Sequence, residues 1–377
     1  MIAQGQCLDR RRHELLLLGR EGVPEQRSSQ VMVVQSDFAQ LDGHVADPSD
    51  VSGNECPKKL PNPAVGGDYA GTYSRRVPQA TLTSPRTTLT NPWLRRVLLT
   101  NLILEIGIVV TGGLVRLTGS GLGCPTWPQC VPGSFTPVPQ QEQGFHKFIE
   151  FGNRTLTGAV GLAALLAIVA VWRWAPGRRA LLRISFLPLV GVLLQAILGG
   201  ITVLTGLNPA IVAAHFLASM VLVSLSAYLL YRAGEGDAAP VALARKEIRS
   251  LAWVTAALGA VILMLGTAVT GSGPHSGDAA TPRFGFDPRT ISWLHADAVM
   301  LFVGLVVAVL LAVHLTTTDP RPRRVWHAVF GVTVLQGLIG YTQYLTGLPE
   351  VLVLIHMLGA SLLTLSLTYG VLSLRRR

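Results

Sequence analysis

Three histidines lie inside long apolar stretches of the chain: His215, His295 and His356. An ionisable side chain is costly inside a membrane, so such a residue by default predicts a function. His215 and His356 each follow a predicted turn, at 206–209 and 347–349, by about two helical turns. His295 lies at a similar depth in its own stretch. All three are therefore expected at one level, in the outer third of a bilayer.

Imidazoles at equal depth on facing helices can supply both axial ligands of a heme iron. His295 and His356 meet this requirement and predict one heme with two histidine ligands. Shifting His295 back by about 142 residues reaches Asn153, so His215 would face an asparagine, a poor iron ligand. A core histidine bonded to a helix carbonyl is the alternative for any one of them, but three at matched depth favour ligation.

A second group of polar residues lies at the entry to the stretch that contains Asn153. His146, Glu150 and Asn153 are four and three residues apart, so they share one face of a helix. A carboxylate beside a weakly ligated iron is suited to proton transfer or to stabilising a developing positive charge, which makes Glu150 the predicted catalytic residue. An ion pair with Arg154 is the structural alternative. His146 lies further out and either lines the entrance or ligates iron from an irregular helix start.

The connection after the first apolar stretch contains Cys124 and Cys130, six positions apart. Two cysteines on the oxidising side of a membrane are expected to form a disulfide, with a redox-active pair as the alternative. Several basic residues lie near the same face, opposite to the usual bias. They are predicted either to pair with heme propionates or to be solvated at the surface; they are Arg116, Lys147, Arg154 and Arg289.

Membrane helices must position these residues. The chain has 377 residues, of which 49% are hydrophobic and 14% charged, against about 25% charged in soluble domains. Stretches long enough to cross about 30 Å of hydrocarbon recur, at 97–116, 146–172, 183–204, 210–231, 251–271, 290–313, 326–345 and 350–372. The predicted fold class is therefore all-α, a polytopic membrane protein of eight transmembrane helices. Residues 1–90 are polar and aperiodic, and predict a disordered cytoplasmic extension.

The charge of the chain is strongly positive, with 31 Lys and Arg, 21 Asp and Glu, and a net charge of +10. The basic residues cluster in alternate connections between apolar stretches, as topology signals do, and not on one soluble face. We therefore predict no binding of nucleic acid. The basic connections and both termini are expected on the cytoplasmic side of a cell membrane.

The membrane part contains a tandem repeat. At an offset of 141, without gaps, 9 of 22 residues are identical between 194–215 and 335–356. Two four-helix units in the same orientation, 91–232 and 233–377, are therefore predicted, related by an axis along the membrane normal. Among the identical positions are Gln195/Gln336, Gly199/Gly340 and His215/His356.

Together these motifs resemble the heme A synthase family over about residues 91–372. The matching pieces are the end of the first stretch at 111–122, the Cys-Pro-x-Trp-Pro-x-Cys loop at 124–130, the pair Ile149-Glu150 and the three spaced histidines. The resemblance implies two pseudo-symmetric four-helix bundles. It also implies oxidation of the C8 methyl group of heme O, by two hydroxylations and loss of water, to the formyl group of heme A for cytochrome c oxidase.

The same resemblance implies roles for individual residues. His295 and His356 would hold a heme b cofactor, and His215 would face the substrate, heme O. Glu150 would be the acidic residue that activity requires. The implied partners are a heme O synthase, the assembly of cytochrome c oxidase and an electron donor that the sequence does not name, all in the setting of membrane lipid.

Asn153 departs from the family's pattern, because many members carry a second histidine of the first unit there. The ligation of the substrate heme therefore stays open, with His146 as a substitute ligand. Cys124 and Cys130 match the cysteine pair of the family's outer loop.

Two other classes of function compete with this interpretation. A b-type membrane cytochrome that exchanges electrons with quinol would need heme sites at both faces. His314 and His327 lie at the opposite ends of their helices, but among loop arginines that are typical of an interface. A heme or solute transporter would explain the repeat, but neither Glu150 nor the paired cysteines. We therefore expect an oxidoreductase.

Overall fold

Eight long helices make up the membrane part of the chain in the computed structural model, which describes residues 91–278 and 281–377. Each is long and apolar enough to cross a membrane, which confirms the predicted all-α, polytopic fold. The extension predicted at 1–90 lies outside the described residues. The helices are α2 (Pro92–Leu117), α3 (His146–Trp174), α4 (Arg179–Leu204), α5 (Pro209–Ala233), α6 (Lys246–Ser272), α7 (Pro288–Thr316), α8 (Pro320–Leu345) and α9 (Glu350–Ser373).

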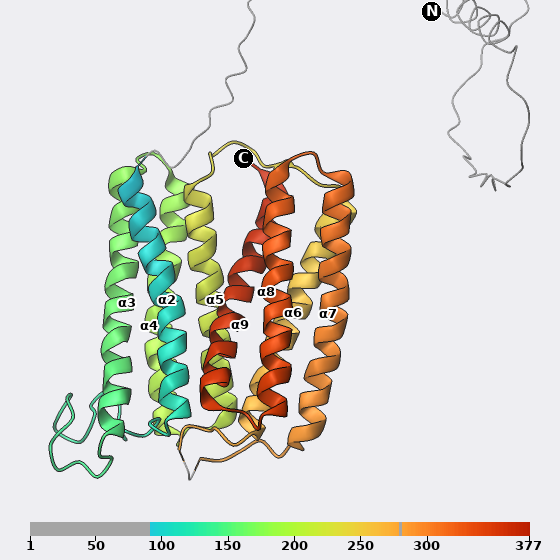
Figure 1. The fold of residues 1–377 in the computed structure, drawn as a ribbon. Helices are drawn as coiled ribbons and strands as arrows, with labels where there is room; N and C mark the ends of the chain where they lie inside the picture. The colour runs from blue at the N-terminus through green and yellow to red at the C-terminus, as the bar shows by residue number, and fades with distance from the viewer. Residues whose placement is uncertain (1–90, 279–280) are drawn as a thin grey trace, which may run out of the picture. The chain divides into compact units, whose positions relative to one another are not determined.

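These helices pack as two four-helix bundles (Figure 1). In the first bundle α2, α3, α4 and α5 form a ring, with α5 closing on α2, and α6 to α9 form the second ring in the same way. In consequence α3 faces α5 across the first ring, and α7 faces α9 across the second. The bundles meet through α5 and α9, flanked by the contacts of α2 with α9 and of α5 with α6. A short antiparallel pair, β1 (Val241–Ala242) with β2 (Arg375–Arg376), joins the last connection of the first bundle to the C-terminus.

Four helices begin at an Asn-Pro or Asp-Pro pair, and this moves some starts beyond the predicted apolar stretches. An Asn or Asp side chain satisfies a free N–H at the start of a helix, and proline in the first position loses no hydrogen bond there. The apolar stretches begin at 97 and 326, whereas α2 and α8 begin at 92 and 320. The capping residues are Asn91, Asn208, Asp287 and Asp319.

The turns between α4 and α5 and between α8 and α9 are built alike. Leu207 and Leu348 both have positive φ, at 59° and 62°. Leucine rarely adopts this conformation, and the strain is on the order of 1–3 kcal/mol. The N–H of Leu207 donates to the carbonyl of Thr202 at 2.8 Å, and that of Leu348 to the carbonyl of Gln343 at 2.7 Å. Positions 141 apart thus share an unusual backbone, which extends the repeat from sequence to conformation.

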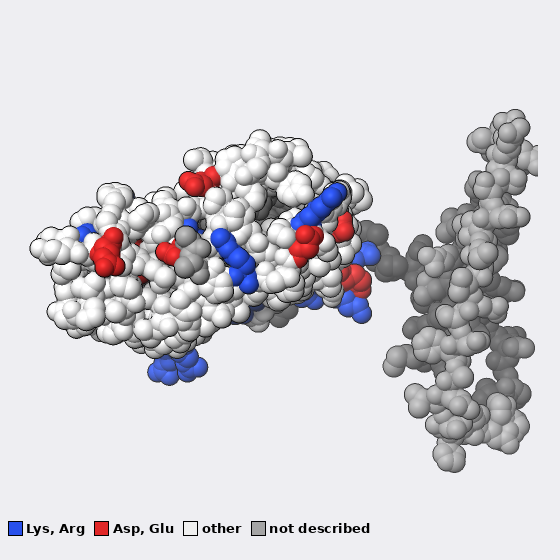
Figure 2. Space-filling view, turned by 90° about the horizontal axis from the view of Figure 1, so that it is seen from below, with Lys and Arg blue, Asp and Glu red and all other residues white. Residues whose placement is uncertain are grey.

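The two ends of the helices differ in charge. We call the end with the connections 118–145 and 273–287 the loop end, and the end with the connections 175–178, 234–245 and 317–319 the arginine-rich end. Figure 2 views the loop end, where charged side chains are few among neutral ones. Among the described Lys and Arg residues, sixteen lie toward the arginine-rich end and five toward the loop end.

Candidate functional site

His295 and His356 come from α7 and α9, which face each other across the second bundle. His295 is the eighth residue of α7 and His356 the seventh of α9, so both lie about 10 Å below the loop end. The Nδ1 atom of each ring is buried and has no hydrogen-bond partner among the described residues. A buried polar atom without a partner is costly, and a ligand outside the chain would remove that cost. The Nδ1 atom of His215, the seventh residue of α5, is likewise buried without a hydrogen-bond partner among the described residues.

Each of these histidine rings packs against a glycine of the neighbouring helix. An added methyl group would lie 3.3 Å from Cε1 of His215 or of His295, and 3.4 Å from Cε1 of His356. Because glycine has no Cβ, the ring lies close to the helix backbone, which limits its direction. The pairs are Gly199 with His215, Gly266 with His295, and Gly340 with His356.

Two glutamines tie the histidine-bearing helices to their neighbours. Gln195 donates from Nε2 to the carbonyl of His215 at 2.9 Å, and Gln336 donates in the same way to the carbonyl of His356 at 3.1 Å. Gln195 also donates to the hydroxyl of Ser219 at 2.6 Å. Hydrogen bonds between membrane helices are worth about 0.6–2 kcal/mol each. They fix the same register between α4 and α5 as between α8 and α9.

The first bundle lacks a second imidazole opposite His215. Asn153 is the eighth residue of α3, as His295 is of α7, so the predicted equivalence holds in depth. Its Oδ1 accepts a hydrogen bond from the hydroxyl of Thr111 on α2 at 2.7 Å. Gly107 of α2 corresponds to Gly266 of α6, but an added methyl group there would meet nothing within 4 Å. The position of the missing histidine thus leaves space beside α2.

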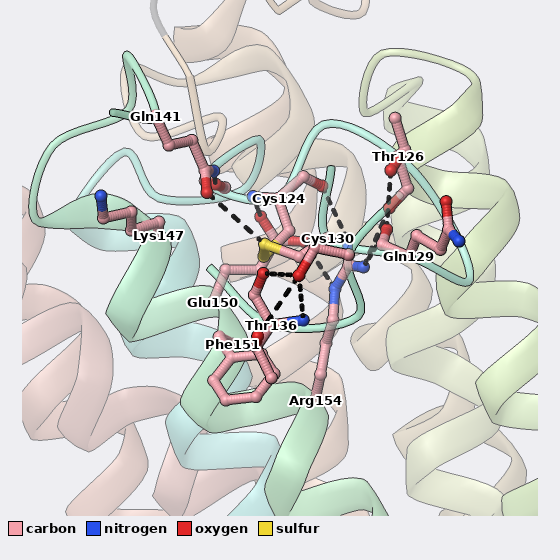
Figure 3. The surroundings of a disulfide bond; sticks show 12 residues. Cys124, Thr126, Gln129, Cys130, Thr136, Gln141, Lys147, Glu150, Phe151 and Arg154 are labelled. Atoms are coloured by element: carbon pink, nitrogen blue, oxygen red, sulfur yellow. Dashed lines mark hydrogen bonds and ion pairs between the residues drawn. A yellow bond between two sulfur atoms is a disulfide. The ribbon is translucent and has the colours of Figure 1, made fainter. Parts of the chain in front are cut away.

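Glu150 fastens the disulfide loop to α3 (Figure 3). The structure contains the predicted disulfide between Cys124 and Cys130. Oε2 of Glu150 accepts a hydrogen bond from the N–H of Cys124 at 2.7 Å, and Oε1 accepts one from Nη2 of Arg154 at 2.6 Å. The loop also reaches α4, where the ring of Trp127 packs on a glycine. The carboxylate of Glu150 is therefore part of a structural clamp.

Arg154 completes the clamp with its remaining donors. Nη1 donates to the carbonyls of Thr126 and Gln129 at 2.9 and 3.2 Å, and Nη2 donates to the carbonyl of Cys124 at 2.7 Å. Nε donates to Glu150 at 3.1 Å. The ion pair that was the alternative for Glu150 is thus present, with the glutamate side chain 6% exposed. All three nitrogens of Arg154 are engaged, which leaves none for a propionate.

The other basic residues near the loop end differ in whether their side-chain donors are already engaged. Lys147 is buried and donates from Nζ to the carbonyl of Val138 at 2.6 Å, so it too is used by the loop. Arg116 donates to the carbonyls of His275 and Thr270, in the second bundle, at 2.6 and 2.7 Å. It has no carboxylate partner among the described residues. Of these basic residues, Arg116 is therefore the best candidate to bind an anion. Arg289 is exposed at the surface.

His146 lies at the first position of α3 and is exposed. Its Nδ1 shares a hydrogen bond with the hydroxyl of Ser120 at 2.8 Å. It lies seven residues before Asn153 on the same helix, about 10 Å nearer the loop end. His146 is thus held at the entrance to the first bundle and not at the level of His215.

Sequence reasoning missed two buried polar residues in the middle of α2. Glu105 is 3% exposed and Asn101, one turn away, is 1% exposed. Asn101 donates from Nδ2 to the hydroxyl of Ser226 at 3.0 Å, whereas Oε1 of Glu105 has no partner among the described residues. The signal that could have found Glu105 is a carboxylate at the centre of an apolar span.

Comparisons with known proteins agree with this architecture. Residues 95–279, which include Glu150, Asn153 and His215, match the family COX15-CtaA, described as cytochrome oxidase assembly protein. Similar proteins of Bacillus cereus (strain G9842), Bacillus anthracis and Bacillus thuringiensis subsp. konkukian are named heme A synthase. They are 25%, 26% and 26% identical over 285 residues, which cover 71% of this chain and 89% of each relative. Over residues 95–279 the chain is therefore similar to the COX15-CtaA family of cytochrome oxidase assembly proteins.

Proposed function

We propose that the chain is a heme A synthase, an oxidoreductase that converts the C8 methyl group of heme O to the formyl group of heme A. The relatives named heme A synthase support this function. One observation carries it: His295 and His356 face each other at one depth, each against a glycine and each with an unpartnered ring nitrogen. That donor set fits a heme b, which His295 and His356 would hold through their imidazoles.

In this proposal the two bundles have different tasks. Heme b held by His295 and His356 supplies one-electron transfer when bound. His215 orients heme O in the first bundle, where Asn153 is a poor ligand and leaves the iron with one strong protein ligand. Because α5 and α9 pack against each other, the ligand helices of the two sites are direct neighbours. Arg116, between the bundles, is the basic residue that would hold a propionate.

Glu150 is proposed to be the acidic residue that the reaction requires. Its carboxylate lies on α3, one turn nearer the loop end than Asn153, and can hold or transfer a proton at Oε2. The same oxygen accepts the N–H of Cys124, so loss of Glu150 would also loosen the loop. Glu150→Gln separates the two roles, because an amide keeps the size and one acceptor oxygen but not the charge.

We also propose that the arginine-rich end and both termini lie in the cytoplasm. Basic residues accumulate in the cytoplasmic connections of membrane proteins, and sixteen against five is a strong bias. A disulfide at the loop end agrees with an oxidising compartment there. Heme O would come from a heme O synthase in the same membrane, and the product would go to cytochrome c oxidase under assembly.

The decisive experiment is extraction of heme from cells that contain a heme O synthase, with and without this chain. Heme A is expected only when the chain is present. Glu150→Ala should abolish heme A while bound heme b remains in the spectrum. Formation of heme A by that variant would refute the assignment of Glu150. A purified protein without a Soret band, even after hemin is added, would refute the heme sites as a whole.

The b-type cytochrome without heme modification is the second candidate, favoured by one contact at the arginine-rich end. The rings of His314 and His327, on α7 and α8, lie 6.0 Å apart between centroids. Nδ1 of His327 is engaged by the carbonyl of Arg323 at 2.7 Å, and both histidines are exposed. A cytochrome of this kind would lose heme in His314→Ala and would form no heme A. The heme A synthase proposal expects unchanged heme content in that variant.

A further inference from the structure

A cavity of about 410 Å³ lies at the arginine-rich end, where the two bundles meet. Its wall comes from α2 and α5 of the first bundle and from α8 and α9 of the second. The polar lining residues are Arg95, Tyr231, Arg321 and Tyr369, and leucines form most of the remaining wall. The proposed ligands of the heme A synthase lie toward the opposite end, so the cavity has no part in that chemistry.

Polarity changes with depth in this cavity. Arg95 and Arg321 are in the first turns of α2 and α8, at the level where lipid headgroups lie. Leu99 and Leu102 line the cavity one and two turns deeper on α2, and Leu365 does so on α9. From Arg95 to Leu102 the gradient from charged to apolar covers about 10 Å. This order, charge at the end and hydrocarbon below, matches a phospholipid standing in its leaflet.

The two arginines of the cavity have no carboxylate partner among the described residues. The acids of the neighbouring connection are already used, since Glu235 pairs with Arg232 at 2.8 Å and Asp237 pairs with Arg178 at 3.0 Å. Asp319 caps α8 through a backbone N–H at 2.8 Å. Two guanidinium groups without a carboxylate partner therefore line one cavity, where both can donate hydrogen bonds to a bound anion.

The aromatic residues hold one of these cations in place. The guanidinium of Arg321 lies 4.9 Å from the ring centre of Tyr231. The hydroxyl of Tyr231 donates to the carbonyl of Leu372 on α9 at 3.0 Å, and its ring meets that of Tyr369 edge-on at 5.4 Å. A stacked guanidinium keeps its N–H edge free for a planar, two-point contact, the geometry in which arginine binds phosphate.

We propose that this cavity binds the phosphate headgroup of an anionic phospholipid, with the acyl chains against the leucines. Basic pockets between membrane helices bind such headgroups. Leu99 is 40% exposed, so the apolar part of the cavity opens toward the surrounding lipid. A phosphate ion alone would use the arginines but leave the leucine wall without a role. Since Arg95 belongs to the first bundle and Arg321 to the second, one bound lipid would link both bundles.

The test uses the purified full chain with its heme, in a neutral detergent. It is titrated with phosphatidylglycerol, with phosphatidylcholine or with inorganic phosphate, and retained lipid is counted by native mass spectrometry. The midpoint of thermal unfolding is followed by the Soret band. Phosphatidylglycerol is expected to be retained and to raise the midpoint, while phosphatidylcholine and inorganic phosphate are not. Arg95→Gln with Arg321→Gln should weaken retention by at least about tenfold.

A matched control removes the same charge from neighbouring positions. Arg96→Gln with Arg324→Gln deletes two exposed arginines one and three residues away, neither of which lines the cavity. This pair should retain phosphatidylglycerol like the parent chain. Should the first double variant fold poorly, Arg95→Lys with Arg321→Lys keeps the charge but loses the two-point contact, and intermediate retention is expected.

Three results would overturn the proposal. Equal retention of phosphatidylglycerol and phosphatidylcholine would show that charge plays no part. Equal weakening by both double variants would show that only the net charge of this end matters. A midpoint raised as much by inorganic phosphate as by phosphatidylglycerol would make this a site for free anions and not for lipid.

Discussion

The two bundles place different residues on nearly the same scaffold. Both have a histidine seven positions into their last helix, backed by a glycine and tied by a glutamine, at His215 and His356. They differ at the facing position, where the second bundle has His295 and the first has Asn153. A repeat can thus keep its packing while the facing pair changes from two histidines to a histidine and an asparagine. In the proposed function the bis-histidine site holds the cofactor, and the site with one histidine, which we call the open site, admits substrate.

Loss of one of the histidines should have the largest effect on heme binding. His356→Ala and His295→Ala should each lower the heme b bound to the purified chain by more than about tenfold, because each removes one of the two histidines that would hold it. His215→Ala should leave that heme in place and lower only heme bound in the first bundle. The pyridine hemochrome assay, with exposed His146→Ala as control, measures the effect. Equal loss of heme in all four variants would contradict the division of tasks.

The clamp at Glu150 has no counterpart in the second bundle, where the equivalent position is Ser292. Glu150→Ala leaves Arg154 without its carboxylate partner, and removing one partner of a buried pair costs about 3–5 kcal/mol. The midpoint of thermal unfolding should therefore fall clearly. Ser292→Ala removes only a hydrogen bond within α7, from the serine hydroxyl to the carbonyl of Pro288, and should change the midpoint little.

Asn153→His tests whether the open site can be closed. An imidazole at the depth of His295 would face His215 and supply the absent ligand. We expect the ratio of bound heme to protein to rise, with a second low-spin signal. Asn153→Ala is the control, since it loses the hydrogen bond to Thr111 without adding a ligand. An unchanged spectrum in the histidine variant would show that the bundles are not equivalent at this position.

Two equivalent glycines, one in each bundle, differ in what surrounds them. Gly266→Ala would place a methyl group 3.3 Å from Cε1 of His295, so the ring must shift and heme affinity should fall severalfold. Gly107→Ala meets nothing within 4 Å and exchanges glycine for a better helix former, a gain of up to about 1 kcal/mol. Measured on both variants, heme content should therefore fall in Gly266→Ala, whereas the unfolding midpoint should rise in Gly107→Ala.

The smallest effect is expected at the arginine-rich end of the first bundle, from Asp237. Its hydrogen bond with Arg178 lowers the pKa of this carboxyl, so the pair stabilises the chain above the pKa of the unfolded state. The contribution is lost as the pH falls through the folded pKa. Because Asp237 is half exposed, Asp237→Asn should cost at most about 1 kcal/mol near pH 7. Thermal unfolding of both chains should show no difference in acid; a difference that grows there would contradict the sign.

Local patterns were enough to predict the fold and the depth of the three histidines. Hydropathy gives the spans, and counting from the turns gives the depth, because a helix rises by a constant amount per residue. Helix starts were missed where an Asn-Pro or Asp-Pro pair adds a polar turn, as at Asn91 and Asp319. That signal was present in the sequence. So was Glu105, an acid in the middle of an apolar span.

Partners that are backbone carbonyls could not be predicted. Arg154 and Lys147 are basic residues that could bind an anion, but both donate hydrogen bonds to carbonyls of the disulfide loop. Carbonyls are present at every residue, so the sequence carries no mark of the ones that converge. The contacts of Arg116 with carbonyls of the second bundle, and the cavity between the bundles, depend likewise on how distant helices meet.

The shared interface of α5 and α9 has a thermodynamic consequence. The helix that carries His215 packs on the helix that carries His356, so an adjustment of either one on binding porphyrin alters the surface that the other meets. The free energy of such coupling is reciprocal. If binding of the cofactor raises the affinity for substrate by some factor, binding of substrate must raise the affinity for the cofactor by the same factor. An enzyme built in this way would lose its heme cofactor less readily while substrate is bound.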